Sequence, residues 1–203
     1  MTTFDREASG RRLRLSPTTS ALLVIDVQDR LVHAMDRSTI EGVIRNIRIL
    51  IDAARHLNIP IFVSQQYPKG LGNTVEPIER ALAEVDQKQN PIRRWDKVEF
   101  SAVNTEGFAK FDVAGEKGFA QWLVCGLEAH VCVYQTVRDI TGWGSTVHLA
   151  SDAIASRTKA NWRCGVSLAR DAGALITSTE TIVFDLLGKA GTPPFKALSQ
   201  AIK

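Results

Sequence analysis

The sequence predicts an α/β fold with three αβα layers around a doubly wound, mostly parallel, Rossmann-like sheet. Short apolar runs recur along the chain, each run is followed closely by a polar residue or a glycine, and helical patterns separate the runs. A strand that is buried on both faces has such a run. Strands that alternate with helices require crossover connections, which make a parallel sheet covered on both sides.

The first half of the chain begins this alternation. Residues 21–25 form an apolar run that stops at Asp26, which predicts the first strand. Apolar residues then recur every three or four positions from residue 40 to residue 57, which predicts a long helix that ends at Asn58. Residues 59–63 are the second expected strand.

The second half continues the pattern after a segment that is harder to interpret. Residues 65–74 are rich in turn formers and are expected to form an ordered loop, and a helix is expected near Pro77. Residues 90–118 show no clear pattern. The remaining expected elements are strands at 121–125, 146–150 and 174–176, and helices through 133–140, 159–171 and 182–187, the last capped by Ser178 or Thr179.

Length and composition suit one domain that does not bind nucleic acid or membranes. We expect an N-terminal arm at residues 1–19 and a single domain at 20–203. The net charge of +3 is small and both signs are mixed along the chain, which argues against a nucleic-acid or membrane surface. Arg11, Arg12 and Arg14 are the densest basic stretch and are expected to be solvated.

The three cysteines predict free thiols in a reducing compartment. Their number is odd and no CxxC spacing occurs. The apolar run near the start of the chain is too short for a signal peptide or a membrane span, so we expect a cytoplasmic protein.

Two polar residues beyond strand ends are candidates for chemistry, since ligands bind at the carboxyl ends of parallel strands. Asp26 follows the first strand, where a helix cap or a solvated turn residue is the alternative. Cys132 falls near the first turn of a helix, where backbone N–H groups favour a thiolate, so its pKa is expected to lie below the ordinary value. A buried structural role is the alternative for Cys132, and it is our interpretation of Cys125. Cys164, in the middle of a helix, is also interpreted as structural, although its pattern does not show which face of the helix it occupies.

Several segments together resemble the isochorismatase-like hydrolase superfamily. They are Leu22-Leu-Val-Ile-Asp-Val-Gln28, Lys97-Val-Glu-Phe-Ser101, Val124-Cys-Gly-Leu-Glu-Ala-His-Val-Cys-Val133 and Ser151-Asp-Ala-Ile-Ala-Ser-Arg157, in the order typical of the superfamily. Residues 65–72 and 179–187 are most similar to the small isochorismatase domain-containing proteins. Without this resemblance, Lys97 is one basic residue among three and would be interpreted as a surface lysine.

The resemblance implies a cysteine hydrolase. Cys132 would be the nucleophile, Asp26 the general base and then acid, and Lys97 the group that stabilises charge. It also implies a non-proline cis peptide at Leu127–Glu128, with the N–H groups of Glu128 and Cys132 forming an oxyanion hole. Asp26 and Lys97 are expected to lie in a cleft rather than in the core, so that replacing either should leave folding largely intact.

Departures from the superfamily pattern narrow the substrate. Nicotinamidases carry metal ligands after the second strand, but residues 65–74 contain no histidine, so no metal is expected and nicotinamide is disfavoured. Isochorismatases lack the cysteine, so Cys132 argues against isochorismate. A small amide or related C–N compound remains, with Gln66 and Tyr67 lining its pocket or forming a purely structural turn. No phosphate-loop or dinucleotide motif occurs, so no cofactor is expected.

Two other classes of protein remain open. One is a binding or scaffold protein that keeps the fold with little turnover, and the other is a redox-active thiol protein whose second cysteine approaches Cys132 in space. His130 lies two residues before Cys132, which does not place both on one helical face, so a supporting role is expected for it. Superfamily members usually self-associate, so a homo-oligomer is expected.

Overall fold

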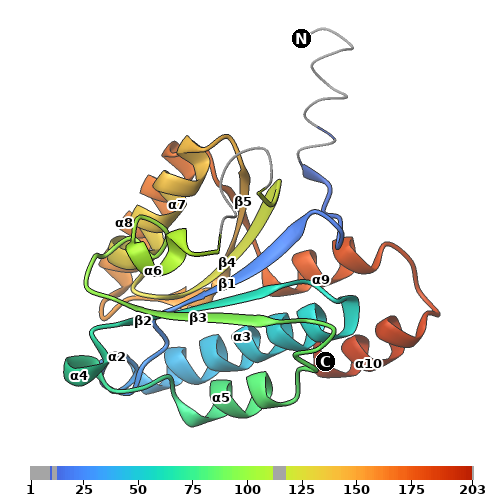
Figure 1. Cartoon of the computed structure of the whole chain (residues 1–203), viewed down its shortest axis with the longest axis horizontal. Helices are drawn as coiled ribbons and strands as arrows, with labels where there is room; N and C mark the ends of the chain where they lie inside the picture. The colour runs from blue at the N-terminus through green and yellow to red at the C-terminus, as the bar shows by residue number, and fades with distance from the viewer. Residues whose placement is uncertain (1–9, 11–12, 112–117, 203) are drawn as a thin grey trace, which may run out of the picture.

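A six-stranded parallel sheet forms the centre of the molecule, in the order β3-β2-β1-β4-β5-β6 (Figure 1). The computed structural model describes residues 10, 13–111 and 118–202. The strands are β1 (Ser20–Ile25), β2 (Ile61–Gln66), β3 (Ile92–Lys97), β4 (Gln121–Leu127), β5 (Thr146–Ala155) and β6 (Leu175–Thr177). The helices are α2 (Asp29–His33), α3 (Arg37–Leu57), α4 (Pro68–Leu71), α5 (Glu76–Ala83), α6 (Glu106–Ala109), the π-helical turn η2 (Ala129–Val133), α7 (Tyr134–Gly142), α8 (Lys159–Asp171), α9 (Thr179–Leu187) and α10 (Pro193–Ile202).

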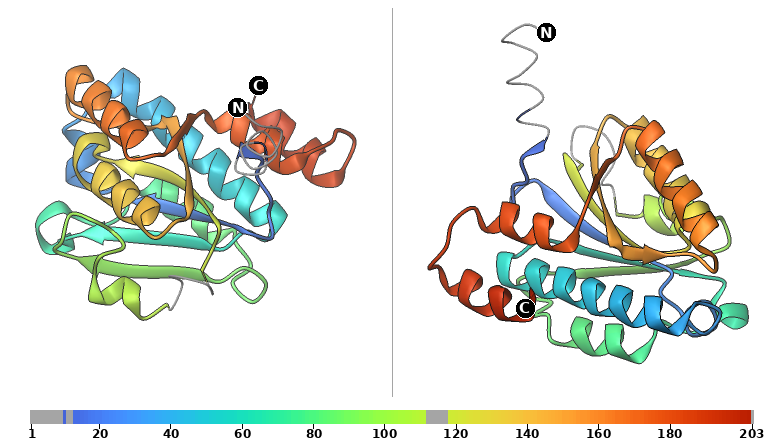
Figure 2. Two further views of the ribbon diagram at one scale, coloured as in Figure 1. Left: turned by 90° about the horizontal axis from the view of Figure 1, so that it is seen from above. Right: turned by 180° about the vertical axis from the view of Figure 1, so that it is seen from behind.

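Helices cover both faces of the sheet, so the predicted three-layer αβα fold is confirmed. Helices α3, α5 and α9 bury their apolar side chains against one face, which contains Leu22 and Val24 of β1. Helices α6, α7 and α8 cover the opposite face, which contains Leu23 and Ile25 (Figures 1 and 2). All six residues of β1 are buried because this strand lies between β2 and β4 and under both helical layers.

The expected helix boundaries agree closely with the structure where capping signals exist. The Asp36 side chain accepts a hydrogen bond from the Thr39 N–H at the start of α3, and Asn58 ends that helix in a left-handed conformation with φ 54°. Ser178 caps α9 by accepting a hydrogen bond from the Thr181 N–H. The Pro77 prediction is also confirmed, since α5 begins at Glu76.

Three expectations for the strands and loops were wrong or incomplete. Strand β2 extends to Gln66, and the loop after it contains the single turn α4. Strand β5 continues five residues past the expected end. The segment without a clear pattern contains the edge strand β3, which exposes part of its surface and therefore alternates instead of forming an apolar run.

The last described residues of the expected N-terminal arm pack against the domain. Leu15 is buried in the larger core, whereas Arg14 is exposed. Arg11, Arg12 and residues 112–117 lie outside the described residues. Within the described ranges, no helix is both long enough and apolar enough to cross a bilayer.

Candidate active site

The two charged candidates from β1 and β3 meet at the carboxyl end of the sheet. Lys97 ends β3 and its Nζ lies 2.7 Å from Oδ2 of Asp26, the residue directly after β1. Both side chains are fully buried, although the sequence predicts a cleft. The site lies where β1 is flanked by β2 on one side and β4 on the other, which is the topological switch point of the sheet.

The Lys97 ammonium is fully engaged by protein acceptors. Besides Asp26, its Nζ donates to Gln66 Oε1 at 2.6 Å and approaches the main-chain oxygens of Glu99 and Phe100 at 3.2 and 3.3 Å. An ammonium has three N–H donors, so these acceptors use all of them. Lys97 therefore supplies positive charge to the site and has no donor left for a substrate in this arrangement.

Asp26 adopts a left-handed backbone conformation with φ 51°. Strand alternation would direct its side chain to the α3 face, with Leu22 and Val24. Instead its Oδ1 accepts a 2.7 Å hydrogen bond from the Ser64 hydroxyl, on the same face of β2 as Phe62, which packs on the α7 side. The unusual conformation thus places the carboxylate on the face of the sheet that carries Cys132.

Gln66 and Gln28 hold the end of β2 and the following loop in place. The Gln66 amide donates to the Val98 carbonyl at 2.9 Å while its Oε1 accepts from Lys97. Gln28 Oε1 accepts the Gln66 N–H at 2.7 Å, and its Nε2 donates to the carbonyls of Gln66 and Gly72. Gln66 therefore lies beside the Lys97–Asp26 pair, and its amide group is occupied by protein partners.

Cys132 is placed by two glycines as well as by its own turn. It lies in η2, the turn that follows β4. Only Val133 separates it from the start of α7. A Cβ on Gly126 would lie 2.0 Å from the Ile25 oxygen, and one on Gly165 would lie 2.5 Å from the Ala129 main chain. Only glycine permits these approaches, which bring β4 against β1 and α8 against η2.

The pKa of Cys132 is raised, so the expectation of a lowered pKa was wrong. Burial is the main cause, the negative charge of Asp26 adds to it, and Lys97 opposes it, which together move the pKa from 9.0 to about 12. Because the charges of both Asp26 and Lys97 act on the pKa of this thiol, the two groups lie near it. The resting site is therefore a neutral thiol beside a buried carboxylate–ammonium pair.

Glu128 and His130 support the turn that carries Cys132. The Leu127–Glu128 peptide is cis, as the resemblance implied. The Glu128 carboxylate accepts from the Arg157 backbone N–H at 3.0 Å and from its Nε at 3.2 Å, while His130 Nδ1 lies 3.0 Å from Ser156 Oγ. Both side chains are thus bonded to the two residues that directly follow β5.

Tyr67 lies at the rim of the site. It is 53% exposed and adopts φ 37°, and its main-chain N–H donates to the Lys97 carbonyl at 2.8 Å. It lines a cleft of about 530 Å³ with Lys97, Glu99 and Glu106.

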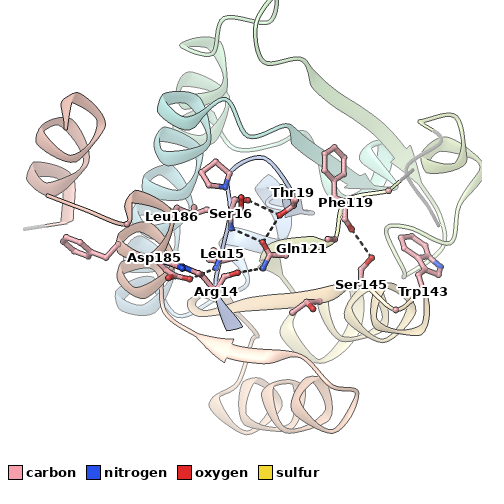
Figure 3. Close-up of a pocket in the computed structure, with 17 residues that line it drawn as sticks. Arg14, Leu15, Ser16, Thr19, Phe119, Gln121, Trp143, Ser145, Asp185 and Leu186 are labelled. Atoms are coloured by element: carbon pink, nitrogen blue, oxygen red, sulfur yellow. Dashed lines mark hydrogen bonds between the residues drawn. The ribbon is translucent and has the colours of Figure 1, made fainter. Parts of the chain in front are cut away.

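A larger hollow of about 1080 Å³ opens at the amino ends of β1, β4 and β5, remote from the charged pair (Figure 3). Its lining includes Arg14, Gln121, Ser145 and Asp185 and none of the candidate catalytic residues. Size therefore does not identify the candidate site; the cluster of titratable groups does.

The other two cysteines lie away from the candidate site, and the loop after β2 has no arrangement of metal-binding side chains among the described residues. Cys125 is buried on the α3 face, opposite Cys132, and Cys164 is exposed on α8, so it has no structural core role. In the described ranges, no group of three or more His, Cys, Asp or Glu side chains is placed to hold a metal ion. Gln65, near the end of β2, holds the loop that follows, because its Oε1 accepts from the Thr74 N–H and hydroxyl.

Comparisons of sequence and structure identify the family of this chain. The Isochorismatase domain matches residues 20–181. The chain is 36% identical to a Phytophthora sojae protein named secreted isochorismatase effector Isc1, over 97% of this chain and 90% of that protein. It is 30% identical to isochorismatase domain-containing protein 2 of Danio rerio, over 93% and 89% of the two chains. The structure of the MAR1 ribonuclease of Caenorhabditis elegans superposes with a TM-score of 0.82 at 35% identity, covering 93% of this chain and 92% of the other. The chain therefore belongs to the isochorismatase family, whose members are hydrolases.

Proposed function

We propose that the protein is a metal-independent cysteine hydrolase that acts on a small amide or related C–N compound. The observation that carries the proposal is the fully buried Lys97–Asp26 pair within reach of the Cys132 thiol. A buried ion pair adds little to stability compared with apolar residues of similar volume, so its presence beside a nucleophile favours a catalytic role.

The reaction begins with a neutral thiol. Asp26 accepts the Cys132 proton as the sulfur attacks the substrate carbonyl carbon, and a C–S bond forms. The main-chain N–H groups of Glu128 and Cys132 stabilise the resulting oxyanion. Asp26 then protonates the leaving nitrogen as the C–N bond breaks, which leaves a thioester on Cys132.

Water completes the cycle. Asp26 removes a proton from the attacking water, the C–S bond breaks, and the proton returns to the Cys132 sulfur as the carboxylic acid product leaves. Lys97 acts throughout by its charge, which holds the Asp26 carboxylate in place and favours the developing thiolate.

Turnover of a panel of small amides and ureides by the wild type and by Cys132→Ser tests this function. We expect ammonia or amine release from at least one compound, loss of release in Cys132→Ser, and full activity after prolonged chelation. RNA belongs in the panel because a relative is named a ribonuclease. Cleavage of RNA alone, or activity that chelation removes and zinc or iron restores, would contradict the proposal.

The alternative, a scaffold with little turnover, predicts no release from any compound and no reaction of Cys132 with small electrophiles. A redox role lacks structural support, because Cys125 lies on the other face of the sheet and Cys164 is exposed. Self-association into a homo-oligomer also remains a prediction, which light scattering on the purified protein would test.

A further inference from the structure

The segment between Lys97 and α6 contains a buried hydroxyl without a partner. Ser101 is 5% exposed, and its Oγ has no hydrogen-bond partner among the residues that the structure describes. Buried hydroxyls in folded proteins are nearly always bonded, and an exception requires a physical reason. The reaction proposed above does not use this group.

Hydrogen bonds on both sides of Ser101 place it between the charged pair and the nucleophile. The preceding carbonyl, that of Phe100, lies 3.3 Å from Lys97 Nζ. The following N–H, that of Ala102, donates to the Thr136 hydroxyl at 2.8 Å, and this hydroxyl donates to the Cys132 carbonyl at 2.6 Å. One peptide neighbour of Ser101 is therefore tied to Lys97 and the other, through one hydroxyl, to the turn that carries Cys132.

Other unpartnered buried polar atoms do not share this location. Asn90 Oδ1 lies just before β3, and Trp122 Nε1 belongs to the second residue of β4. Both positions are at the amino ends of strands, whereas the catalytic candidates are at the carboxyl ends. Among these three, Ser101 alone combines an unused hydrogen-bonding group with proximity to the reacting residues.

We propose that the Ser101 hydroxyl contacts the substrate and accepts the N–H of its scissile amide. This inference rests on the proposed hydrolase function. The leaving nitrogen must lie near Asp26, which protonates it, and Asp26 is paired with the lysine that the Ser101 segment surrounds. A hydroxyl at this point favours amides and ureides over esters, because it can accept from an amide N–H, whereas the alkoxy oxygen of an ester has no hydrogen and is a weak acceptor for the hydroxyl proton.

Two thiol-directed probes test the contact without knowledge of the natural substrate. Acrylamide and methyl acrylate carry an amide N–H and an ester oxygen, respectively, on the same acryloyl group, so they compare a donor with none near Cys132. In both, the Cys132 sulfur bonds to the β-carbon and the thiol proton ends on the α-carbon. Intact-mass spectrometry gives the two labelling rate constants, and free cysteine supplies the intrinsic ratio between them.

We expect the wild type to favour acrylamide relative to that intrinsic ratio, and Ser101→Ala to lower the preference by about 3- to 10-fold, the range for loss of one hydrogen bond. Ser101→Thr keeps a hydroxyl and should retain most of the preference. The midpoint of thermal unfolding should stay unchanged or rise in Ser101→Ala, because an unpartnered buried hydroxyl is removed. It should fall in the control Thr136→Val, whose hydroxyl has two protein partners.

An unchanged probe ratio in Ser101→Ala would overturn the inference while leaving the hydrolase proposal intact. A fall in thermal midpoint as large as that of Thr136→Val would also overturn it, since the hydroxyl would then have a structural partner. If neither probe labelled Cys132 in the wild type, both the inference and the proposed function would be wrong.

Discussion

The two ends of the central sheet both gather polar side chains, but they do so in different ways. At the amino end, Gln121 binds the segment before β1: its Oε1 accepts from the Ser16 N–H at 3.0 Å and the Thr19 hydroxyl at 3.1 Å, and its Nε2 donates to the Arg14 carbonyl (Figure 3). At the carboxyl end, two opposite charges are fully buried beside a thiol.

This difference distinguishes polar groups that hold the fold together from polar groups that are placed for chemistry. The amino-end groups are mostly neutral, mutually bonded and next to the larger hollow. The carboxyl-end groups carry charge that is costly to bury, and Ser101 beside them has an unused hydroxyl. If function resides at the carboxyl end alone, substitutions there should impair the chemistry of Cys132 and substitutions at the amino end should not.

The largest effect is expected for Asp26→Asn, which retains the shape of the side chain and removes the base. Acylation of Cys132 by an amide substrate should fall by about 10²–10⁴-fold, as is typical for general acid–base groups. Asp185→Asn is the matched control at the other end of the sheet, where Asp185 Oδ2 accepts only the Leu15 N–H among the hydrogen bonds of the described residues. Equal acylation rates for the two variants, measured by rapid quench and mass spectrometry, would show that Asp26 is not the base.

A large effect is also expected on the protonation of the Cys132 thiol. With a pKa of about 12 against 9.0, the thiolate fraction of Cys132 at neutral pH should be about a thousandfold below that of an ordinary thiol. The absorbance of thiolate near 240 nm, as the difference between wild type and Cys132→Ser, measures it. Lys97→Met should raise the pKa further, because the opposing charge is removed, and Asp26→Asn should lower it.

The raised pKa of Cys132 also makes the free energy of unfolding depend on pH. The folded protein holds the Cys132 proton more tightly than the unfolded chain does. This contribution is therefore complete below about pH 9 and is lost as the pH rises from 9 towards 12. The free energy of unfolding should decline less steeply over this range in Cys132→Ser than in the wild type. An identical slope in both would contradict the raised pKa.

A smaller effect is expected from breaking the buried pair. Among the described residues, Lys97→Met leaves the buried Asp26 carboxylate with the Ser64 hydroxyl as its one side-chain hydrogen-bond partner, which should cost about 3–5 kcal/mol of unfolding free energy. Arg94→Met on the same strand is the control, because its ion pair with Glu79 is half-exposed and should contribute about 0–1 kcal/mol.

A double variant measures how much the interaction between Asp26 and Lys97 contributes to stability, apart from the effect of each side chain alone. Asp26→Asn with Lys97→Met removes both buried charges, so its loss should be well below the sum of the two single losses. Denaturant unfolding of the four proteins gives the coupling energy. Additive losses would mean that the two groups do not stabilise each other.

Sequence patterns predicted the strands that are buried on both faces and predicted others less well. The central strand β1 is an apolar run because helices cover both sides, whereas the edge strand β3 alternates and gave no clear signal. Lys97 ends that strand, so only the family resemblance identified it. The pKa of Cys132 was predicted in the wrong direction because helix position is visible in sequence and burial is not.

The supporting residues of the site were not predicted because their partners are distant in sequence. The Thr136 hydroxyl accepts from the N–H of Ala102, 34 residues earlier. The Ser64 hydroxyl on β2 donates to Asp26, which follows the neighbouring strand β1. Ser64 carried one usable signal: it is a hydroxyl at the carboxyl end of an apolar run, next to the strand that ends at Asp26. Thr136 lies on a helix with an ordinary apolar pattern and carried none.

The smallest effect is expected at the amino end. Gln121→Met removes hydrogen bonds to Ser16, Thr19 and Arg14, which are only partly buried, so water can replace much of what is lost there. It also removes a longer, 3.4 Å bond from the buried Ser20 hydroxyl. The free energy of unfolding should fall by about 1 kcal/mol, and the rate of Cys132 labelling by acrylamide should not change. The unchanged rate is the informative result, because this side chain lines the larger hollow. A tenfold loss of labelling in Gln121→Met, with the protein still folded, would mean that the two ends of the sheet are coupled and that polarity at the amino end is not purely structural.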